Sequence, residues 1–296
     1  MTSVAFIGLG AMGAPMAENL LKRQFRVTGF DMRQSALDAL VAAGGHSATS
    51  AAEAAKGADI LLLMVVNAAQ ARSVLFGAGA LAALNVGGTV ILMATCPPGE
   101  VEAIAAEVEA SGRAFIDAPV SGGVVGAKAA TLTIMAAAPD AAFAKVKPVL
   151  AALGDKLFHV GQKPGQGAMV KTVNQLLCGV HIAACAEALS LAQKAGIDGG
   201  LLLEILGGSA ASSWMLKDRG PRMLVDDPPV TSAVDIFVKD LGIVLDAGRS
   251  SKAALPLAAA AHQMFLAASG MGHGLADDAQ VLRAYRALNR KPANDA

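Results

Sequence analysis

The chain has 296 residues, of which 54% are hydrophobic and only 16% are charged, so it can bury a sizeable core and is not intrinsically disordered. Basic and acidic residues number 24 each, which gives a formal net charge of zero. This balance offers no basic surface, so we expect no nucleic-acid partner. It also does little to keep copies of the chain apart, which favours self-association.

The N-terminus enters an apolar run at residues 4–7 without the basic start and long apolar stretch of a signal peptide. Two apolar helical stretches, 176–192 and 253–268, are interrupted by polar residues before they reach the ~20 apolar residues that cross a membrane. The three cysteines lack a metal-ligand spacing with histidine. We therefore expect a cytoplasmic protein with reduced thiols, no bound metal and no membrane partner.

Short aliphatic and β-branched runs recur through the first half of the chain and alternate with helical patterns, such as 12–21, 34–41 and 101–110. The predicted strands are 4–7, 27–30, 60–65, 89–93, 114–116, 132–135 and 157–160. This alternation predicts a mostly parallel sheet with helices on both faces.

A glycine-rich turn follows the first predicted strand and opens the first helix, Gly8-Leu9-Gly10-Ala11-Met12-Gly13. Here Gly8 permits a tight turn, Gly10 lets a pyrophosphate approach the backbone, and Gly13 lets helix and strand pack closely. The N-terminal N–H groups of the helix then face the phosphates. The motif predicts a Rossmann-like dinucleotide-binding domain, against the alternative of a glycine-rich turn that binds nothing.

Asp31 ends the second predicted strand, where dinucleotide-binding folds carry an acid for the adenosine ribose. A carboxylate accepts hydrogen bonds from both ribose hydroxyls and repels the 2′-phosphate of NADP, so we expect NAD as the cofactor. Arg33 either offsets part of this repulsion or is an ordinary solvated arginine.

Residues 117–123 follow another predicted strand, and ligands of open α/β sheets bind beyond such strand ends. Ser121 offers a hydroxyl, and Gly122 and Gly123 leave their N–H groups unshielded, an arrangement that suits a carboxylate. The alternative is a purely structural turn.

After Gly161 the pattern becomes helical, and breakers at 207–208, 228–229 and 256 divide the remainder into four or five helices. We predict an NAD-binding domain over residues 1–162 and an all-helical substrate and oligomerisation domain over residues 163–296. The fold class is α/β, with a Rossmann-like domain followed by an all-α C-terminal domain.

The first long helix carries Lys171 and Asn174 on one face, which Cys178 and His181 continue. Lys171 has apolar neighbours, so we expect its turn of the helix to be partly buried. A second lysine, Lys239, stands within another apolar helical stretch.

Together these motifs resemble the β-hydroxyacid dehydrogenases, the family of 3-hydroxyisobutyrate dehydrogenase and tartronate semialdehyde reductase. The matching segments are 8–13 with 16–20, 117–123, 167–174 and 239–241, in the family's order and over nearly the whole chain. The resemblance implies an NAD-dependent enzyme for a small hydroxy-acid substrate, assembled as a homodimer or homotetramer.

The resemblance also implies roles for single residues. Lys171 matches the catalytic lysine, and Asn174 matches the substrate-orienting asparagine. Ser121, Gly122 and Gly123 match the loop that holds the substrate carboxylate. The residues matched to cofactor contacts are Gly8, Leu9, Gly10, Ala11, Met12, Gly13, Asp31, Val65, Val66, Thr95 and Lys239. Two departures, at Ala130 and at the alanines 136–138, replace glycines that are usual in the family and put the loop geometry there in doubt.

Oxidation of the alcohol sends a hydride to the nicotinamide and the hydroxyl proton to a base. A free lysine has a pKa near ~10.4. Partial burial of Lys171 and the nearby cation Lys239 would both lower that pKa, which suits a general base.

Several segments, among them 65–70, 174–184, 213–215 and 234–241, resemble the L-threonate dehydrogenase branch, which oxidises a four-carbon sugar acid next to its carboxylate. The alternatives are a 3-hydroxyisobutyrate dehydrogenase, a tartronate semialdehyde reductase, or a non-catalytic dinucleotide sensor, which would not need Lys171. His181 is either a hydrogen-bond donor to the substrate or a core histidine, and Trp214 is either a pocket wall or a helix anchor.

Overall fold

The structure is a computed structural model that describes residues 2–289. The chain divides into two compact units, Met1–Lys171 and Thr172–Ala296, and each is described here by itself. The division falls inside the helix α9 (Gln166–Lys194). The domain boundary between residues 162 and 163 stays a prediction.

Within the described residues, the first unit contains one nine-stranded sheet with the order β3-β2-β1-β4-β5-β6-β8-β7, and β9 pairs with β8. Neighbours from β3 to β6 are parallel, while β8 runs antiparallel to β6 and β7. The predicted, mostly parallel sheet is confirmed, and the short strands β3 and β7 are additional. The strands are β1 (Ser3–Ile7), β2 (Arg26–Phe30), β3 (His46–Ser47), β4 (Ile60–Leu63), β5 (Thr89–Leu92), β6 (Ala114–Asp117), β7 (Val120–Ser121), β8 (Thr133–Ala137) and β9 (Lys156–Gly161).

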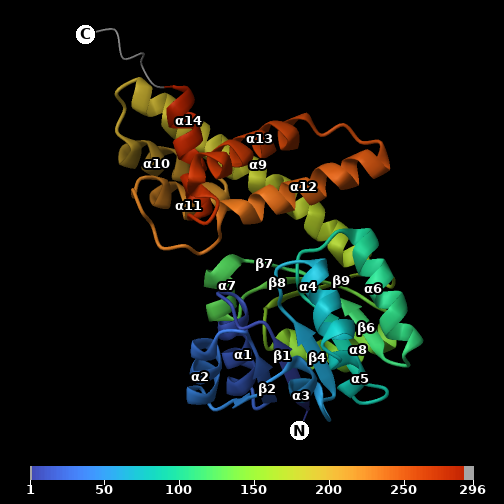
Figure 1. Cartoon of the computed structure of the whole chain (residues 1–296). Coiled ribbons are helices and arrows are strands. Elements are labelled where there is room, and N and C mark those ends of the chain that lie inside the picture. Colours follow the sequence, from blue (N-terminus) through green and yellow to red (C-terminus); the bar gives the residue numbers. More distant parts are fainter. Residues whose placement is uncertain (1, 290–296) are drawn as a thin grey trace. The chain divides into compact units, whose positions relative to one another are not determined.

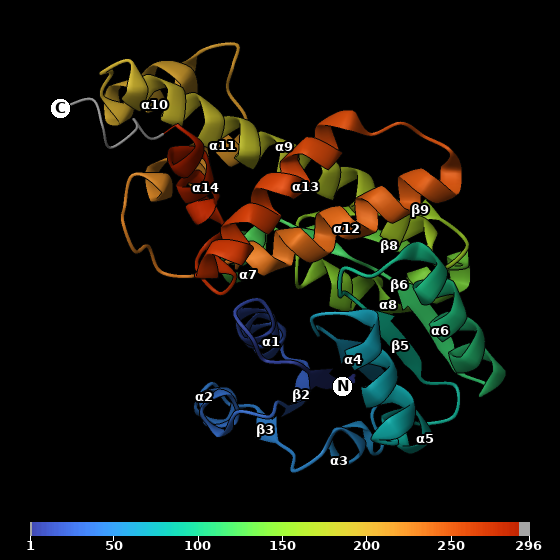
Figure 2. The same ribbon diagram turned by 45° about the horizontal axis from the view of Figure 1, so that its top comes forward.

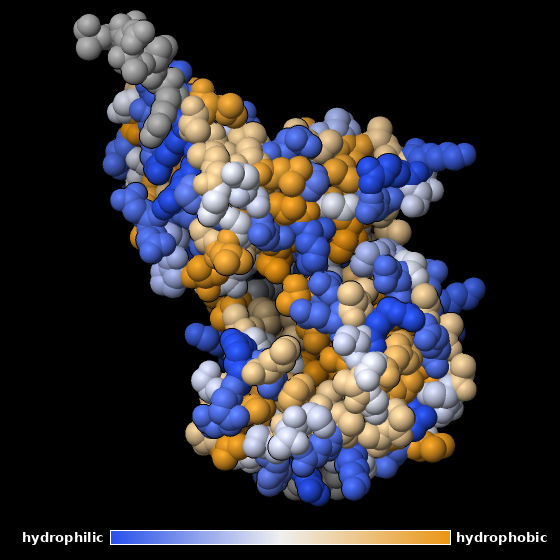
Figure 3. All heavy atoms as spheres, in the orientation of Figure 1, coloured by the Kyte–Doolittle hydropathy of each residue, from blue (hydrophilic) through white to orange (hydrophobic). Residues whose placement is uncertain are grey.

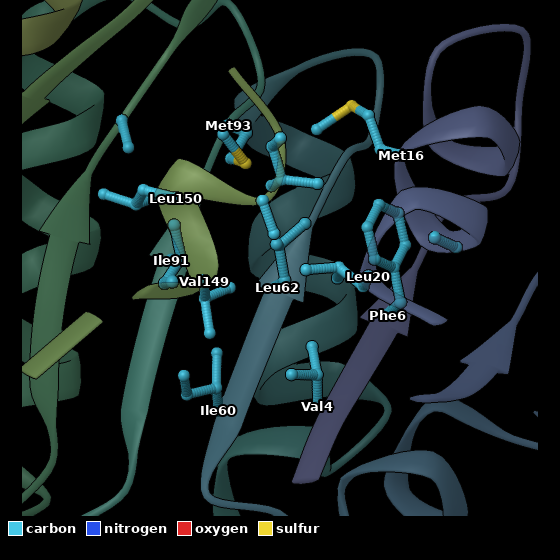
Figure 4. Packing of buried hydrophobic residues seen from close by; sticks show 14 of the residues in the cluster. Val4, Phe6, Met16, Leu20, Ile60, Leu62, Ile91, Met93, Val149 and Leu150 are labelled. Atoms are coloured by element: carbon cyan, nitrogen blue, oxygen red, sulfur yellow. The ribbon is translucent and has the colours of Figure 1, made fainter. Parts of the chain in front are cut away.

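Helices cover both faces of this sheet, because successive strand residues point to opposite sides. Ile60 and Leu62 of β4 join one core cluster, whereas Leu61 and Leu63 join the other. Figure 4 shows the first cluster, in which β-strand side chains meet those of α1 and α8. The helices of this unit are α1 (Gly13–Lys22), α2 (Gln34–Ala42), α3 (Ala51–Ala55), α4 (Ala68–Arg72), η1 (Ser73–Gly77), α5 (Ala80–Ala83), α6 (Pro98–Ala110), α7 (Gly123–Ala129) and α8 (Asp140–Ala151), followed by the start of α9.

The regular elements described in the second unit are helices, as predicted, with loops and one isolated β-bridge between them, and Figures 1 and 2 show α12 and α13 side by side. Including α9, it has six α-helices between residues 166 and 289, so the prediction of four or five was too low. The breakers at 207–208, 228–229 and 256 do lie at helix ends or between helices, but residues 278–281 add a short 3-10 helix before one more α-helix. The further elements are α10 (Gly199–Gly208), α11 (Trp214–Met223), α12 (Val234–Ser251), α13 (Pro256–Ala268), η2 (Ser269–His273), η3 (Asp278–Val281) and α14 (Leu282–Leu288).

The helix α9 is long and apolar enough to cross a membrane by length and composition alone. However, 56% of its most apolar window is buried inside the protein. Ile182, Ala186 and Leu189 are fully buried in the core of the second unit, against residues such as Phe265. These residues of α9 are therefore part of the core of the second unit.

Candidate active site

The glycine-rich turn joins β1 to α1, at the point where the strand order reverses between β1 and β4. Gly8 has a φ of +94°, and a Cβ there would lie 2.4 Å from the carbonyl oxygen of Met64. A Cβ at Gly13 would lie 1.9 Å from the carbonyl oxygen of Gly8, whereas a Cβ at Gly10 would meet nothing within 4 Å. The turn is therefore tight at two glycines and open at the third, which fits the approach of a dinucleotide pyrophosphate.

Asp31 is tied to this turn by hydrogen bonds. Its Oδ2 accepts from the Leu9 N–H at 2.8 Å, and its Oδ1 accepts from the Arg33 N–H at 2.9 Å and from Arg33 Nε at 3.0 Å. Burial raises the pKa of Asp31, but the hydrogen bonds from Arg33 and Leu9 outweigh it, so the pKa lies below its usual value. Arg33 also donates to the Leu9 carbonyl at 3.0 Å. It is therefore a partner of Asp31 rather than a purely solvated arginine.

Two further predicted cofactor segments leave the sheet at the same edge as Gly8, because they follow the C-terminal ends of parallel strands. Val65 and Val66 follow β4, and Thr95 follows β5. The N–H of Val66 donates to Gln70 Oε1 at 2.9 Å, so this turn has a fixed shape, while the Val66 side chain is exposed.

The segment Ser121–Gly123 joins β7 to α7. Gly122 and Gly123 have φ values of +128° and +59°, which glycine adopts readily. Ser121 is half-buried beside them. The predicted glycine turn is thus present, and both the exposure of its N–H groups and its role in holding a carboxylate stay predictions.

The two departures from the family's pattern have different consequences. Ala130 ends α7 with a φ of +55°, a left-handed conformation that costs a residue with a side chain about 1–2 kcal/mol relative to glycine. Ala136 and Ala137, in contrast, lie fully buried in β8. Ala136 and Ala137 therefore form strand rather than a turn, and Ala138 lies in a bend just after it.

Sequence reasoning gave no role to Asp117, the last residue of β6. Its buried Oδ2 accepts hydrogen bonds from the N–H groups of Gly165 and Ala168, both at 2.9 Å, at the start of α9. Burial raises the pKa of Asp117 to about 6 in spite of these bonds. The carboxyl group anchors the N-terminus of the helix that carries Lys171. A polar residue ending an apolar strand was the only signal for it.

Lys171 is itself buried, with 7% of its surface exposed, whereas its apolar neighbours Met169, Val170 and Val173 are 39%, 40% and 57% exposed. The expectation of a partly buried lysine is correct, but the apolar neighbours do not enclose it as expected. An amphipathic helix normally shows the opposite arrangement, with its lysines in water and its valines buried.

In the second unit, a hydrogen-bonded chain links α9 to α12. Asn174 Nδ2 donates to Gln175 Oε1 at 2.9 Å and to Cys178 Sγ at 3.3 Å. Gln175 Nε2 donates to Asp240 Oδ2 at 2.5 Å, and Lys239 Nζ donates to Asp240 Oδ1 at 2.6 Å. The carboxylate of Asp240 thus balances the charge of Lys239. This weakens the expectation that the positive charge of Lys239 lowers the pKa of Lys171.

The roles of His181 and Trp214 were left open by the sequence, and both side chains are partly exposed to solvent. His181 is half-buried on α9, and Trp214, at the start of α11, is 51% exposed. Trp214 is therefore not a fully buried helix anchor. Among residues 2–289, no three His, Cys, Asp or Glu side chains cluster to hold a metal ion.

Two family models match the chain, one in each half. Residues 3–161 match the NAD binding domain of 6-phosphogluconate dehydrogenase. Residues 165–285 match a family described as NAD-binding of NADP-dependent 3-hydroxyisobutyrate dehydrogenase.

Individual relatives match over almost the full chain. An L-threonate dehydrogenase of Cupriavidus necator is 46% identical over 96% of both chains. A 3-hydroxyisobutyrate dehydrogenase of Pseudomonas aeruginosa is 34% identical over 97% of this chain and 99% of its own. A crystal structure titled 3-hydroxyisobutyrate dehydrogenase, from Salmonella typhimurium, has a TM-score of 0.92 at 40% identity and covers 96% of this chain and 99% of its own. The chain therefore belongs to the NAD-dependent β-hydroxyacid dehydrogenase family.

Proposed function

We propose that this enzyme oxidises L-threonate at its 2-hydroxyl to 2-oxo-tetronate, with NAD as the hydride acceptor. The observation that carries the proposal is the 46% identity to an L-threonate dehydrogenase, compared with 34% to a 3-hydroxyisobutyrate dehydrogenase. The alternatives, 3-hydroxyisobutyrate dehydrogenase and tartronate semialdehyde reductase, would use the same groups. Family membership favours all three over a non-catalytic sensor.

In the proposed mechanism, Lys171 is the general base that takes the proton of the 2-hydroxyl. Its burial disfavours the charged ammonium and so favours the neutral amine that a base requires. Ser121, Gly122 and Gly123 hold the substrate carboxylate, and Asn174 orients the substrate. Bound NAD supplies the acceptor for the hydride that leaves carbon 2. In the reverse direction the Lys171 ammonium returns the proton.

Gly8, Gly10 and Gly13 admit the cofactor pyrophosphate, while Asp31 accepts hydrogen bonds from the adenosine ribose. Leu9, through its backbone N–H, holds Asp31 in place for this task. The remaining proposed cofactor contacts are Ala11, Met12, Val65, Val66, Thr95 and Lys239. The carboxylate of Asp31 favours NAD over NADP, because it would repel a 2′-phosphate.

We further propose a cytoplasmic homodimer or homotetramer joined through the helical domain. The support is an apolar surface: α10 has no buried residue, and Leu201, Ile205 and Trp214 are more than half exposed. Figure 3 shows hydrophobic side chains on the surface of the helical unit. Exposed apolar groups of this kind gain most by packing against another copy.

The proposal is tested by kcat/KM for L-threonate, D-threonate, 3-hydroxyisobutyrate and D-glycerate under identical conditions. L-threonate should have the highest value. A site that hydrogen-bonds a substrate hydroxyl rejects analogues that lack it, so 3-hydroxyisobutyrate should be poor. A higher kcat/KM for 3-hydroxyisobutyrate would overturn the substrate and leave the family assignment in place.

A further inference from the structure

In the hydrogen-bonded chain between α9 and α12, Asp240 determines which group donates and which accepts at each step. This carboxylate is 2% exposed and forms an ion pair with Lys239. An ionised carboxylate has acceptors and no proton to donate. Any neutral group bonded to its second oxygen must therefore turn a donor toward it.

Gln175 meets that requirement with its amide nitrogen, at 2.5 Å from Asp240 Oδ2. A side-chain amide has one donating and one accepting end, and the hydrogen-bond network decides which end points where. Because the nitrogen of Gln175 is turned to Asp240, its Oε1 is left for Asn174. Asn174 must then turn its own nitrogen to Gln175, and it does so at 2.9 Å.

The amide nitrogen of Asn174 has two protons, and the second is directed to Cys178 Sγ at 3.3 Å. Both donors of Asn174 are therefore used inside the second unit. What Asn174 can offer to a ligand is its oxygen, Oδ1, which is an acceptor.

We propose that Gln175 is a positioning residue that fixes Asn174 as a hydrogen-bond acceptor toward the substrate. The inference rests on the proposed function, in which the single proton of the reacting hydroxyl goes to Lys171 and the substrate carboxylate is ionised. The donor that meets Asn174 Oδ1 is then a second hydroxyl beside the reacting one. The site selects 2,3-dihydroxy acids, and in L-threonate this donor is the 3-hydroxyl.

The test compares L-threonate with its 3-deoxy analogue, 2,4-dihydroxybutanoate, by kcat and KM. The unmutated enzyme should prefer L-threonate by about 10–100-fold in kcat/KM, the effect of leaving the Asn174 acceptor unsatisfied once a substrate excludes water from it. In Gln175→Met, the side-chain amide of Asn174 can flip and present its nitrogen instead of its oxygen. The preference should then shrink to about threefold or less. The loss should come mainly from a higher KM for L-threonate.

The matched control is Gln280→Met. Gln280 is another buried glutamine of the second unit, and it donates to the Val225 carbonyl at 3.2 Å, away from Asn174. This variant should keep the preference for L-threonate. If Gln175→Met does not fold, Asp240→Asn replaces it, since an amide at position 240 no longer dictates which end of Gln175 faces it.

The inference is overturned if Gln175→Met retains the full preference, if Gln280→Met loses it as completely, or if the unmutated enzyme does not distinguish the two acids. A failure of the proposed function looks different, because L-threonate is then no substrate while another hydroxy acid is. That acid is compared with its own analogue lacking the neighbouring hydroxyl. If the preferred acid has no such hydroxyl, the inference falls as well.

Discussion

Two carboxylates of the first unit lie at the C-terminal ends of strands, whereas several polar side chains of the second unit are buried in pairs between distant segments. Asp31 directly follows β2 and Asp117 ends β6, and each accepts hydrogen bonds from backbone N–H groups. In the second unit, Gln175 and Arg219 are buried and reach partners on other helices or turns. The strand-end carboxylates are positioned by the strands and turns beside them, whereas the buried pairs are positioned by the packing of segments that are distant in the sequence.

The clearest example in the second unit is a cluster of ion pairs between α11 and η3. Arg219 binds Asp278 through two hydrogen bonds of 2.9 Å, and Arg222 binds Asp277. Burial raises the pKa of Asp278 in spite of Arg219, whereas the pKa of Asp277 is lowered because Arg222 and backbone N–H groups outweigh its burial. Both carboxylates are fully buried. They therefore depend on their arginine partners.

The largest expected effect on stability follows from removing one of these partners. Arg219→Ala leaves Asp278 buried without its main cation, which should lower the free energy of unfolding by about 3–5 kcal/mol. Arg249→Ala is the control, because Arg249 pairs with Asp246 on the exposed surface of the same unit. Its effect should be about 0–1 kcal/mol. Thermal and urea unfolding of both variants measure the difference, and equal losses would contradict the distinction.

A smaller effect, with a defined pH dependence, is expected at Asp117. Its pKa is raised from 3.8 to about 6, so the folded protein holds this proton more tightly than the unfolded chain. Stability should then fall, by an amount on the order of a few kcal/mol, as the pH rises from about 4 to about 6. Asp117→Asn keeps an acceptor for Gly165 and Ala168 and should remove this decline.

The comparison for Asp117 is Asp59→Asn in the same unit. Hydrogen bonds from Ser3 lower the pKa of Asp59, so its contribution to stability is present above its ordinary pKa and is lost as the pH falls. The two variants should thus change the pH profile of unfolding in opposite directions. An unchanged profile in Asp117→Asn would show that its burial does not affect the proton.

The smallest expected effect concerns the cofactor. Asp31→Ser removes the charge that repels a 2′-phosphate and leaves Arg33 available to bind it, so kcat/KM with NADP relative to NAD should rise about tenfold. Asp38→Ser, which changes an exposed acid of α2, should leave the ratio unchanged. Equal kcat/KM for both cofactors in the unmutated enzyme would contradict the assigned role of Asp31.

The difference between the units also decides what could be predicted from the sequence. The longer strands and the turn Gly8–Gly13 depend on residues close together in the chain, and they were predicted, whereas the two-residue strands β3 and β7 were not. Gln175 and Asp240 are 65 positions apart, and Arg219 and Asp278 are 59 positions apart. No local pattern marks such pairs. The burial of Lys171 beside exposed valines was only half predicted for the same reason, since it depends on tertiary packing.

The most direct test of the central claim is Lys171→Ala, assayed by NADH formation from the preferred hydroxy acid and by NAD binding. Loss of the general base should lower kcat by about 10²–10⁴-fold while NAD still binds, because the proposed cofactor contacts remain. Lys194→Ala, at the exposed end of the same helix, should keep normal kcat. A folded Lys171→Ala enzyme with near-normal kcat would contradict the account.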